Sequence, residues 1–312
     1  MKYTHMVISG GGLYGISMLG VLRYLYIEKK IINIKYISCN SIGSLFGLII
    51  CLKIPIEDIE DLVKETTKEN YYVLTKKNIS NIFTDNGIFD ISLILTKIKK
   101  YIEKKYNIKD INFIELSKKF GYNLYISATN INKLKNKIFS VDNTPNISIY
   151  DAVSASMALP FIFKPIKIDK EYYIDGIFSN NFPINIFKNI HKDNILAIAF
   201  KIKKDYYIKE LEIDKKINFI NYSKRLFNLI INNSTKITFD NYLNNYQSEL
   251  LLIDELPLDT SIPIKINKNE IVYKFNDVDI DNLILEGFIK TSEFFNHIKK
   301  KQINKINFNE NI

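Results

Sequence analysis

The sequence is poor in several residue types that shape other protein classes: it has no tryptophan, seven prolines, three histidines and two cysteines in 312 residues. The two cysteines, Cys39 and Cys51, exclude a disulfide framework. The helix expected between them would separate the thiols by about three turns, which is too far for a bridge. Both are expected to be free thiols, as in proteins of a reducing compartment.

Long hydrophobic runs are also absent. The longest strongly apolar run, residues 45–52, is far too short to cross a bilayer. Residues 1–12 lack the continuous apolar core and the cleavage site of a secretory signal peptide. We therefore expect a cytoplasmic protein without a transmembrane segment.

The formal net charge is +9. Such an excess can indicate an anionic partner, either nucleic acid or a phospholipid surface. The lysines, however, are scattered along a chain that is also rich in isoleucine, asparagine and tyrosine, which favours an ordinary solvated surface. We expect no nucleic-acid partner. No internal repeat or low-complexity linker divides the chain, so residues 1–312 are expected to form a single domain.

The segment 34–52 organises the rest of the chain. An apolar, β-branched run predicts a short buried strand, the tight turn at residues 38–43 follows, and an apolar helix is predicted from Ser44 to Leu52. A serine at the apex of a strand–turn–helix is the geometry of a nucleophile elbow, and Ser41 takes that position. Gly43 supplies the small residue two places later, whereas Cys39 stands where the usual pattern has glycine. A helix N-cap serine is the alternative for Ser41.

A glycine loop precedes this segment. Gly10, Gly12 and Gly15 match the dinucleotide-binding fingerprint, but no carboxylate follows the next strand to hold a ribose. In a parallel sheet, this loop and the loop that carries Ser41 leave at the same carboxyl edge, so the exposed amides of Gly11 and Gly12 would form an oxyanion hole beside the serine. A glycine turn that only permits tight helix packing is the third interpretation.

Asp175 is the candidate partner of Ser41. It ends a predicted strand and is followed by Gly176, although an Asp-Gly turn has the same pattern. By order along the chain, His191 or His297 could complete a Ser–acid–His triad, but His191 follows a polar helix end and His297 lies within a lysine-rich helix. Both are interpreted as surface or packing residues.

The remaining elements follow from periodicity and capping signals. Asp90 or Ser92 is expected to cap one helix, Gly121 to end another, and Ser148 to cap a third that is lined with small residues. The expected strands are 5–9, 123–128, 137–141, 194–200 and 249–257, and the expected helices are 16–26, 93–105, 112–120, 152–157, 217–246 and 281–299.

Taken together, four blocks in this order resemble the patatin-like phospholipase family. They are Gly10-Gly11-Gly12-x-x-Gly15, Ser41-x-Gly43, Ser154-x-Ser156-x-Ala158-Leu159-Pro160-x-x-Phe163-x-Pro165 and Asp175-Gly176. The resemblance covers residues 5–205, the recognisable catalytic core, and is loose over the mostly helical extension 206–312.

The resemblance implies a three-layer α/β/α sandwich with a mostly parallel central sheet. It also implies a carboxylic ester hydrolase that cleaves fatty-acyl esters of phospholipids or related lipids in phospholipase A fashion, at a membrane surface and without a metal or cofactor. The implied nucleophile is Ser41 and the implied general base is Asp175. Gly10, Gly11, Gly12, Gly15 and Ile42 form the implied oxyanion hole.

The chain departs from the family pattern at three positions: Tyr14 replaces a basic residue, Cys39 the first elbow glycine and Ile177 a small residue. These departures leave open a catalytically weak or inactive lipid-binding or regulatory protein. A Rossmann-type nucleotide-binding protein is the further alternative.

Overall fold

The computed structural model describes residues 3–68, 73–201, 229, 250–254, 264–267, 270–273 and 277–309. Within these residues, eight strands form one central sheet in which the order is β11-β10-β1-β2-β5-β9-β8 and β6 also pairs with β5. The strands are β1 (His5–Ile8), β2 (Tyr36–Asn40), β5 (Asn123–Asn130), β6 (Lys135–Phe139), β8 (Ile166–Ile168), β9 (Glu171–Asp175), β10 (Ile195–Lys201) and β11 (Leu250–Asp254).

The centre of this sheet is parallel. β1 pairs in parallel with both β2 and β10, and β2 pairs in parallel with β5. β6 and β9 pair with β5 in the antiparallel sense, so the sheet becomes mixed at one side. The expected α/β fold with a mostly parallel central sheet is therefore confirmed.

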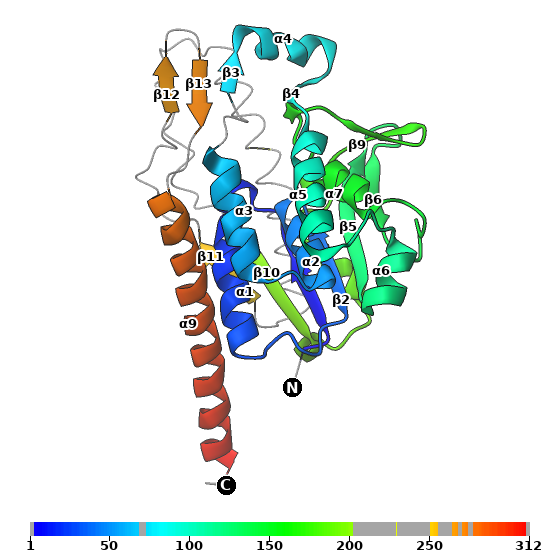
Figure 1. Cartoon of the computed structure of the whole chain (residues 1–312). Coiled ribbons are helices and arrows are strands. Elements are labelled where there is room, and N and C mark those ends of the chain that lie inside the picture. The colour runs from blue at the N-terminus through cyan, green and yellow to red at the C-terminus, as the bar shows by residue number, and fades with distance from the viewer. Residues whose placement is uncertain are drawn as a thin grey trace.

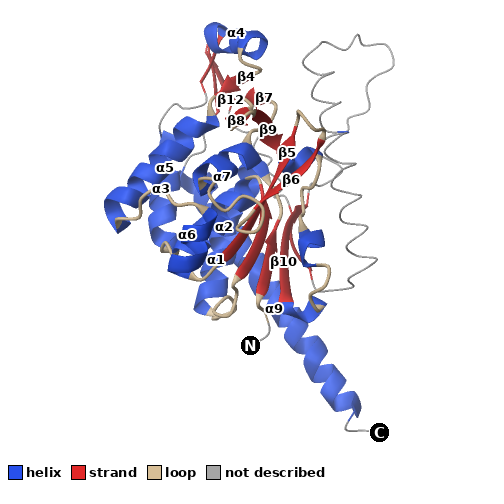
Figure 2. Cartoon of the chain, turned by 90° about the vertical axis from the view of Figure 1, so that its right-hand side faces the viewer, coloured by secondary structure: helices blue, strands red, loops and turns tan. Residues whose placement is uncertain are grey.

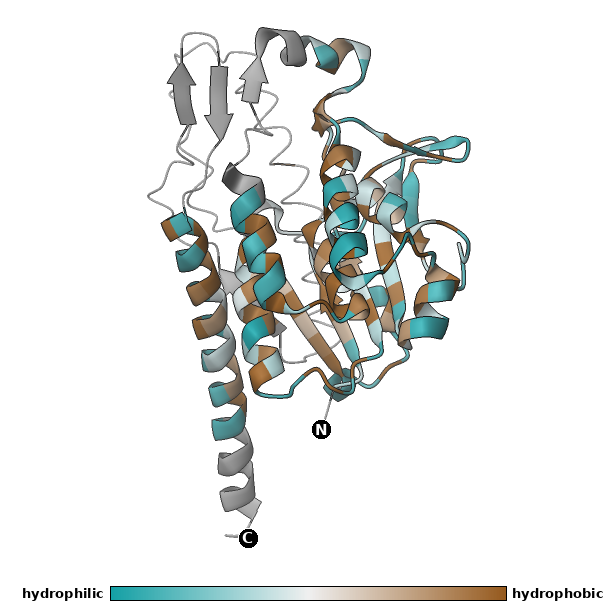
Figure 3. Ribbon diagram, viewed as in Figure 1, coloured by the Kyte–Doolittle hydropathy of each residue, from teal (hydrophilic) through white to brown (hydrophobic). Residues whose placement is uncertain are grey.

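One face of the sheet is covered by helices (Figures 1 and 2). These helices are α1 (Ser17–Ile27), α2 (Ile42–Leu52), α3 (Ile56–Lys68), α5 (Ile91–Tyr106), α6 (Phe113–Phe120) and α7 (Ile149–Met157). α2 lies nearest the sheet and is buried along almost its whole length. α3 and α5 lie farther out and alternate between hydrophilic and hydrophobic residues, as amphipathic helices do (Figure 3).

The other face is covered, in the described part of the chain, by the segment between β9 and β10. This segment contains the short 3-10 helices η2 (Gly176–Phe178), η3 (Ile184–Phe187) and η4 (Lys192–Asn194). Phe182, Ile184 and Phe187 are buried against Val7 and the β10 side chains. This segment therefore forms the second cover of the sheet and directly follows Asp175.

The expected cap at Asp90 and the expected helix end at Gly121 are confirmed, whereas the expected cap by the Ser148 side chain is wrong. Asp90 caps α5 through the Ser92 amide, and Asn112 and Glu115 form a reciprocal capping box at the start of α6. Gly121 ends α6 in the left-handed conformation. Ser148 precedes α7 as expected, but its hydroxyl donates to Asp110 and does not cap the helix.

The closing helix is α9 (Asp277–Asn309), which packs along α1. A Cβ atom at Gly20 would overlap the Ile284 carbonyl oxygen, and one at Gly287 would overlap the Ser17 carbonyl oxygen. Glycines at these two positions therefore let the helix backbones touch, which is how α9 joins the helical layer.

Several small elements above the sheet were not predicted from the sequence. They are η1 (Gly12–Ile16), β3 (Val73–Thr75), β4 (Gly87–Phe89), β7 (Phe161–Phe163), β12 (Ile264–Asn267) and β13 (Glu270–Tyr273). The helix α4 (Lys76–Thr84) lies beside β3 and β4. Figure 1 shows α4 and β4 beyond the end of the sheet at which the parallel strands finish. The helix expected over 217–246 lies, apart from residue 229, outside the described residues. Among the helices that are described, none is long and apolar enough to cross a membrane.

Candidate functional site

Ser41 lies at the sharp turn between β2 and α2, where the parallel strands end. Its backbone has φ 51° and ψ −131°. A positive φ is uncommon for a residue with a side chain and marks local strain, which proteins retain mainly at functional sites. The turn is therefore an elbow that lifts the serine side chain out of the backbone, and the expected local geometry is present.

The elbow depends on close packing on both sides. A Cβ atom at Gly43 would lie 2.6 Å from the carbonyl oxygen of Ser9, so only glycine fits where α2 passes the end of β1. Cys39 is fully buried and its thiol lies 3.4 Å from the carbonyl oxygen of Tyr125. A Cβ atom at Gly47 would lie 3.1 Å from the Cys39 sulfur. Gly47 therefore makes room for the thiol that replaces the usual elbow glycine.

Asp175 meets Ser41 at this edge of the sheet. The serine Oγ donates to Oδ2 of Asp175 across 2.6 Å, although the two residues are 134 positions apart. The main chain of Asp175 is fixed as well: its N–H donates to the Ala158 carbonyl at 2.9 Å, and its own carbonyl accepts from Thr129 Oγ1 at 2.9 Å. The fold thus brings together the two side chains that the sequence singles out.

Asp175 is only 2 % exposed. Burial raises the pKa of Asp175 to about 6, because a desolvated carboxylate is disfavoured. Hydrogen bonds from Ser41, from the Ile177 amide and from Asn40 oppose this shift by stabilising the charged form. A carboxylate with a pKa near 6 is ionised at neutral pH and is more basic than an ordinary aspartate, which suits a proton acceptor.

Three polar residues that the sequence analysis missed complete this cluster. Asn40 is fully buried and donates from Nδ2 to Oδ1 of Asp175 at 3.2 Å and to the Asn181 side-chain oxygen at 3.0 Å. Ser156 accepts from the Ser41 amide at 2.8 Å through its hydroxyl oxygen. Two signals pointed to them: Asn40 directly precedes the serine, and Ser156 belongs to one of the four blocks that resemble the family.

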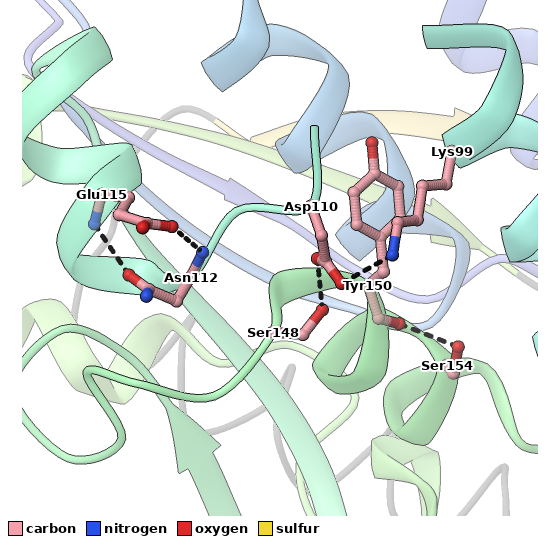
Figure 4. Close-up of polar contacts among 7 residues, drawn as sticks. All are labelled: Lys99, Asp110, Asn112, Glu115, Ser148, Tyr150 and Ser154. Carbon is pink, nitrogen blue, oxygen red and sulfur yellow. Dashed lines mark hydrogen bonds and ion pairs between the residues drawn. The ribbon is translucent and has the colours of Figure 1, made fainter. Parts of the chain in front are cut away.

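The helix that carries Ser156 is anchored at its beginning (Figure 4). The hydroxyl of Ser148 donates to Asp110 at 2.7 Å, and Lys99 of α5 pairs with the same carboxylate at 2.6 Å. Further along, Ser154 donates to the Tyr150 carbonyl at 2.8 Å inside α7 itself. The start of α7 is therefore fixed to α5 and to the loop before α6.

The glycine loop lies directly against the elbow. A Cβ atom at Gly10 would lie 3.0 Å from Cβ of Ser41, and one at Gly15 would collide with the side chain of Ile42. The Gly10 amide, however, donates to the Asn181 carbonyl at 3.2 Å, and Gly15 lies inside η1. This leaves the amides of Gly11, Gly12 and Ile42 as the candidate donors, and the oxyanion hole itself stays a prediction. Gly12 and Ile42 begin helices, where the first amides lack partners within the helix.

The three histidines lie elsewhere. His5 begins β1 and stacks on Tyr36, His191 precedes η4 with an exposed side chain, and His297 lies on the exposed side of α9. Ser41 and Asp175 are therefore not part of a histidine triad in this arrangement. Where side chains are described, no group of three or more His, Cys, Asp or Glu residues could hold a metal ion.

The fold and this edge of the sheet define an α/β protein with a serine–aspartate pair beside a glycine loop. A sequence profile of patatin-like phospholipases matches residues 6–188, which is more than half of the chain. The chain belongs to the patatin-like phospholipase family, and membership of that family places it among lipid hydrolases.

Individual relatives are viral and cellular. An uncharacterized protein of Acanthamoeba polyphaga mimivirus is 27 % identical over 93 % of this chain and 92 % of its own length. A probable lipid hydrolase of Invertebrate iridescent virus 6 is 33 % identical over 61 % of this chain and 64 % of its own length. The crystal structure of VipD from Legionella pneumophila superposes with a TM-score of 0.55 at 17 % identity, covering 95 % of this chain and 67 % of that one, and shows the same fold.

Proposed function

We propose that this protein is a serine lipid acyl hydrolase of the phospholipase A type, in which Ser41 is the nucleophile and Asp175 the general base. The observation that carries the proposal is the 2.6 Å hydrogen bond from Ser41 Oγ to Asp175 Oδ2, made by a serine with positive φ at the end of a parallel strand. A hydroxyl alone is a weak nucleophile, and an adjacent base is what activates it.

In the first half of the reaction, Ser41 Oγ attacks the carbonyl carbon of a fatty-acyl ester while Asp175 Oδ2 takes the hydroxyl proton. The carbonyl oxygen becomes an oxyanion held by the amides of Gly11, Gly12 and Ile42. Loss of one such donor costs about 100- to 1000-fold in turnover in other enzymes. The intermediate then expels the alcohol, which receives the proton from Asp175 and leaves an acyl ester on Ser41.

In the second half, water takes the place of the alcohol. The water oxygen attacks the acyl carbon while Asp175 accepts a proton from that water. Asp175 then returns the proton to Ser41 Oγ when the fatty acid leaves. Each proton that the carboxylate accepts is thus donated again within one cycle. The Asp175 carboxylate must therefore be ionised at the start of each half.

The relatives support a fatty-acyl ester as the substrate. One is a probable lipid hydrolase of Invertebrate iridescent virus 6, and another is a triacylglycerol lipase of Schizosaccharomyces pombe, 26 % identical over 52 % of this chain and 34 % of its own length. The two buried free thiols, Cys39 and Cys51, agree with a reducing, cytoplasmic location. The packing of α9 on α1 agrees with a single domain over residues 1–312.

Fatty-acid release from vesicles of mixed phospholipids tests the proposal. The wild type should release fatty acid, and Ser41→Ala and Asp175→Asn should each lower the rate by at least about 1000-fold, as for removal of a member of other catalytic pairs. A fluorophosphonate should label Ser41 in the wild type, and Ser117→Ala, which changes a serine on α6, serves as the control with full labelling. Unchanged activity in either variant would remove that residue from the mechanism.

The alternatives are distinguished by the same measurements. A catalytically inactive lipid-binding protein would bind lipid but would not be labelled by a fluorophosphonate. A nucleotide-binding protein would bind NAD in calorimetry. The contact between Gly10 and Ser41 disfavours the nucleotide alternative, because the loop is occupied by the elbow.

A further inference from the structure

Large apolar side chains are exposed at the end of the molecule that carries α4, β7 and two hairpins. The six are Phe83 (85 % exposed), Leu134 (87 %), Phe161 (58 %), Ile162 (41 %), Tyr172 (41 %) and Ile131 (37 %). They belong to the segments 83–86, 131–137 and 160–174, which we call the tip surface. Exposed apolar groups scattered singly are normal, but a cluster of them marks an interaction site.

Contacts between the three segments show that they form one surface. The Tyr172 amide donates to Asn132 Oδ1 at 2.6 Å, which joins the β8–β9 hairpin to the β5–β6 hairpin. Lys164 pairs with Asp85 at 2.5 Å, which joins the third segment to the end of α4. A hollow of about 560 Å³ lies between them, and its apolar lining includes Ile131, Phe161 and Tyr172.

Phe161 is held in a strained conformation within this surface. Its φ is 66°, which is unusual for a bulky side chain. The neighbouring backbone is fixed because the Lys164 amide donates to the Phe89 carbonyl at 2.9 Å, and because a Cβ atom at Gly87 would collide with Phe163 and Lys164. A rigid frame thus holds an aromatic ring in solvent at a cost in strain, and such strain is retained mainly where it serves function.

The tip surface is also basic. Its three segments contain six lysines and three carboxylates. Lys133 pairs with Glu171 and Lys164 pairs with Asp85, whereas Lys167 lies over the Tyr172 ring at 5.7 Å. Lys135, Lys167 and Lys170 are exposed. Apolar rings surrounded by an excess of lysines complement a membrane with anionic head groups.

The tip surface adjoins the catalytic pair along the chain. Ile174, which lines the hollow, directly precedes Asp175, and the Asp175 amide is bonded to Ala158, two residues before Pro160 of the same hollow. Phospholipid that meets this surface would therefore lie beside the edge of the sheet that holds Ser41. Figure 2 shows α4, β7, β8 and β9 together at that end.

We propose that the tip surface docks this protein on an anionic phospholipid bilayer, with Phe83, Leu134 and Phe161 inserted among the lipids and the lysines against the head groups. This inference rests on the proposed function, because the role of the docking is to bring the lipid substrate to Ser41. Its own test requires no hydrolysis.

Binding of the full chain to vesicles of dialkyl-ether phospholipids, which contain no ester to cleave, tests the docking. With phosphatidylglycerol in the vesicles, Phe83→Ser with Leu134→Ser should weaken binding at least about tenfold, because two exposed apolar anchors are lost. Its matched control is Ile27→Ser with Ile32→Ser. These two side chains are 62 % and 53 % exposed and lie at the end of α1 and in the connection from α1 to β2. The control should bind like the wild type.

A second pair of variants tests the charges. Replacing Lys135, Lys167 and Lys170 by glutamine should weaken binding about fivefold per lysine on anionic vesicles and much less on pure phosphatidylcholine. Replacing the exposed Lys104, Lys118 and Lys119 by glutamine changes the net charge equally and should leave the binding unchanged. Phe161→Gly separates folding from docking, because glycine tolerates the positive φ: the melting temperature should not fall while vesicle binding does.

Several outcomes would overturn the docking surface. One is that the wild type does not bind anionic vesicles, and another is that the tip-surface variants and their controls bind equally well. A wild-type dimer that becomes monomeric in Phe83→Ser with Leu134→Ser, without vesicle binding, would assign the surface to a second copy of the chain. Normal vesicle binding by a chain that cleaves no ester lipid would instead refute the proposed function and leave the docking surface intact.

Discussion

Asn40 donates from Nδ2 to Oδ1 of Asp175 across 3.2 Å, while Ser41 donates to the other carboxylate oxygen, Oδ2, at 2.6 Å. Two consecutive residues at the end of β2 therefore hold the two oxygens of one buried carboxylate. Asn181 accepts the second proton of the Asn40 amide and so fixes its orientation. Asn40 is thus a positioning residue that stabilises the charged form of the base.

Asn40→Ala should raise the pKa of Asp175 above its present value of about 6, because a hydrogen bond to the ionised form is lost. The acid limb of kcat/KM for fatty-acid release should move to higher pH by up to about one unit, the equivalent of one net hydrogen bond. The pH profile of release from mixed phospholipid vesicles measures this shift.

Asn180→Ala is the matched control for that measurement. Asn180 is also a buried asparagine, but its side chain donates to Asn185 and does not contact the carboxylate. The acid limb of the kcat/KM profile of Asn180→Ala should coincide with that of the wild type. If Asn40→Ala gave the same acid limb as this control, Asn40 would have no influence on the base.

The raised pKa of Asp175 also predicts how stability depends on pH. A carboxyl group with a pKa of 3.8 when unfolded and about 6 when folded binds its proton more tightly in the folded state. The stability that the neutral form provides is fully present below pH 3.8 and is lost as the pH rises through about 6. At pH 8 the buried charge therefore costs stability, up to about 3 kcal/mol for a shift of this size.

Asp175→Asn removes that cost while keeping the contacts. Oδ1 still accepts from Asn40 and from the Ile177 amide, and the new NH₂ group can donate to Ser41. We expect the variant to have a higher free energy of unfolding than the wild type in urea at pH 8, and the gain to shrink towards pH 4. A constant difference across this range would mean that the ionisation of Asp175 is not its source.

The sequence predicted those parts of the fold that follow from local chemistry. Periodicity located α1, α5 and α9, and capping residues such as Asp90 and Gly121 located the helix ends. β7 and β8 were missed because each has only three residues, too few for a strand pattern to be recognised, and each directly follows a proline. Each pairs with a strand that is distant in the sequence or adjacent only through a turn, and the residues of a three-residue strand do not indicate which partner it will have.

The candidate site shows the same division. Ser41, Asp175 and the glycine loop were predicted because turns and glycines leave recognisable patterns. Asn40, Ser156 and Asn181 were not, since an asparagine or serine acquires its role here only from a partner more than 100 residues distant. The bond from the Gly10 amide to the Asn181 carbonyl could not be predicted either, because it also joins residues far apart in the sequence.

Ser156→Ala should impair the elbow without changing substrate binding. The variant removes the hydroxyl that accepts from the Ser41 amide, so the strained turn loses one of its restraints. One net hydrogen bond corresponds to a loss in kcat of about two- to tenfold, with KM unchanged. Ser154→Ala is the control, because the Ser154 hydroxyl bonds only within its own helix (Figure 4). Equal losses in both variants would point to a general weakening of α7.

Gly43→Ala should damage the elbow more severely than any loss of a polar contact. The added methyl group would lie 2.6 Å from the Ser9 carbonyl oxygen and 2.9 Å from the Ile8 carbonyl oxygen, and backbone atoms inside a parallel sheet cannot move aside as a side chain can. Overpacking of this kind costs about 1–3 kcal/mol or more. Relief requires α2 to move away from β1, which would carry Ser41 away from Asp175.

Gly121→Ala provides the comparison for Gly43→Ala. Gly121 has φ 72° with open space around its Cβ position, so alanine there is strained without a collision and should cost about 1 kcal/mol in urea unfolding. Fluorophosphonate labelling of Ser41 should persist in Gly121→Ala and fall sharply in Gly43→Ala at equal folded fraction. Undiminished labelling in a folded Gly43→Ala protein would show that the elbow tolerates displacement of α2, and the close approach at Gly43 would then serve packing alone.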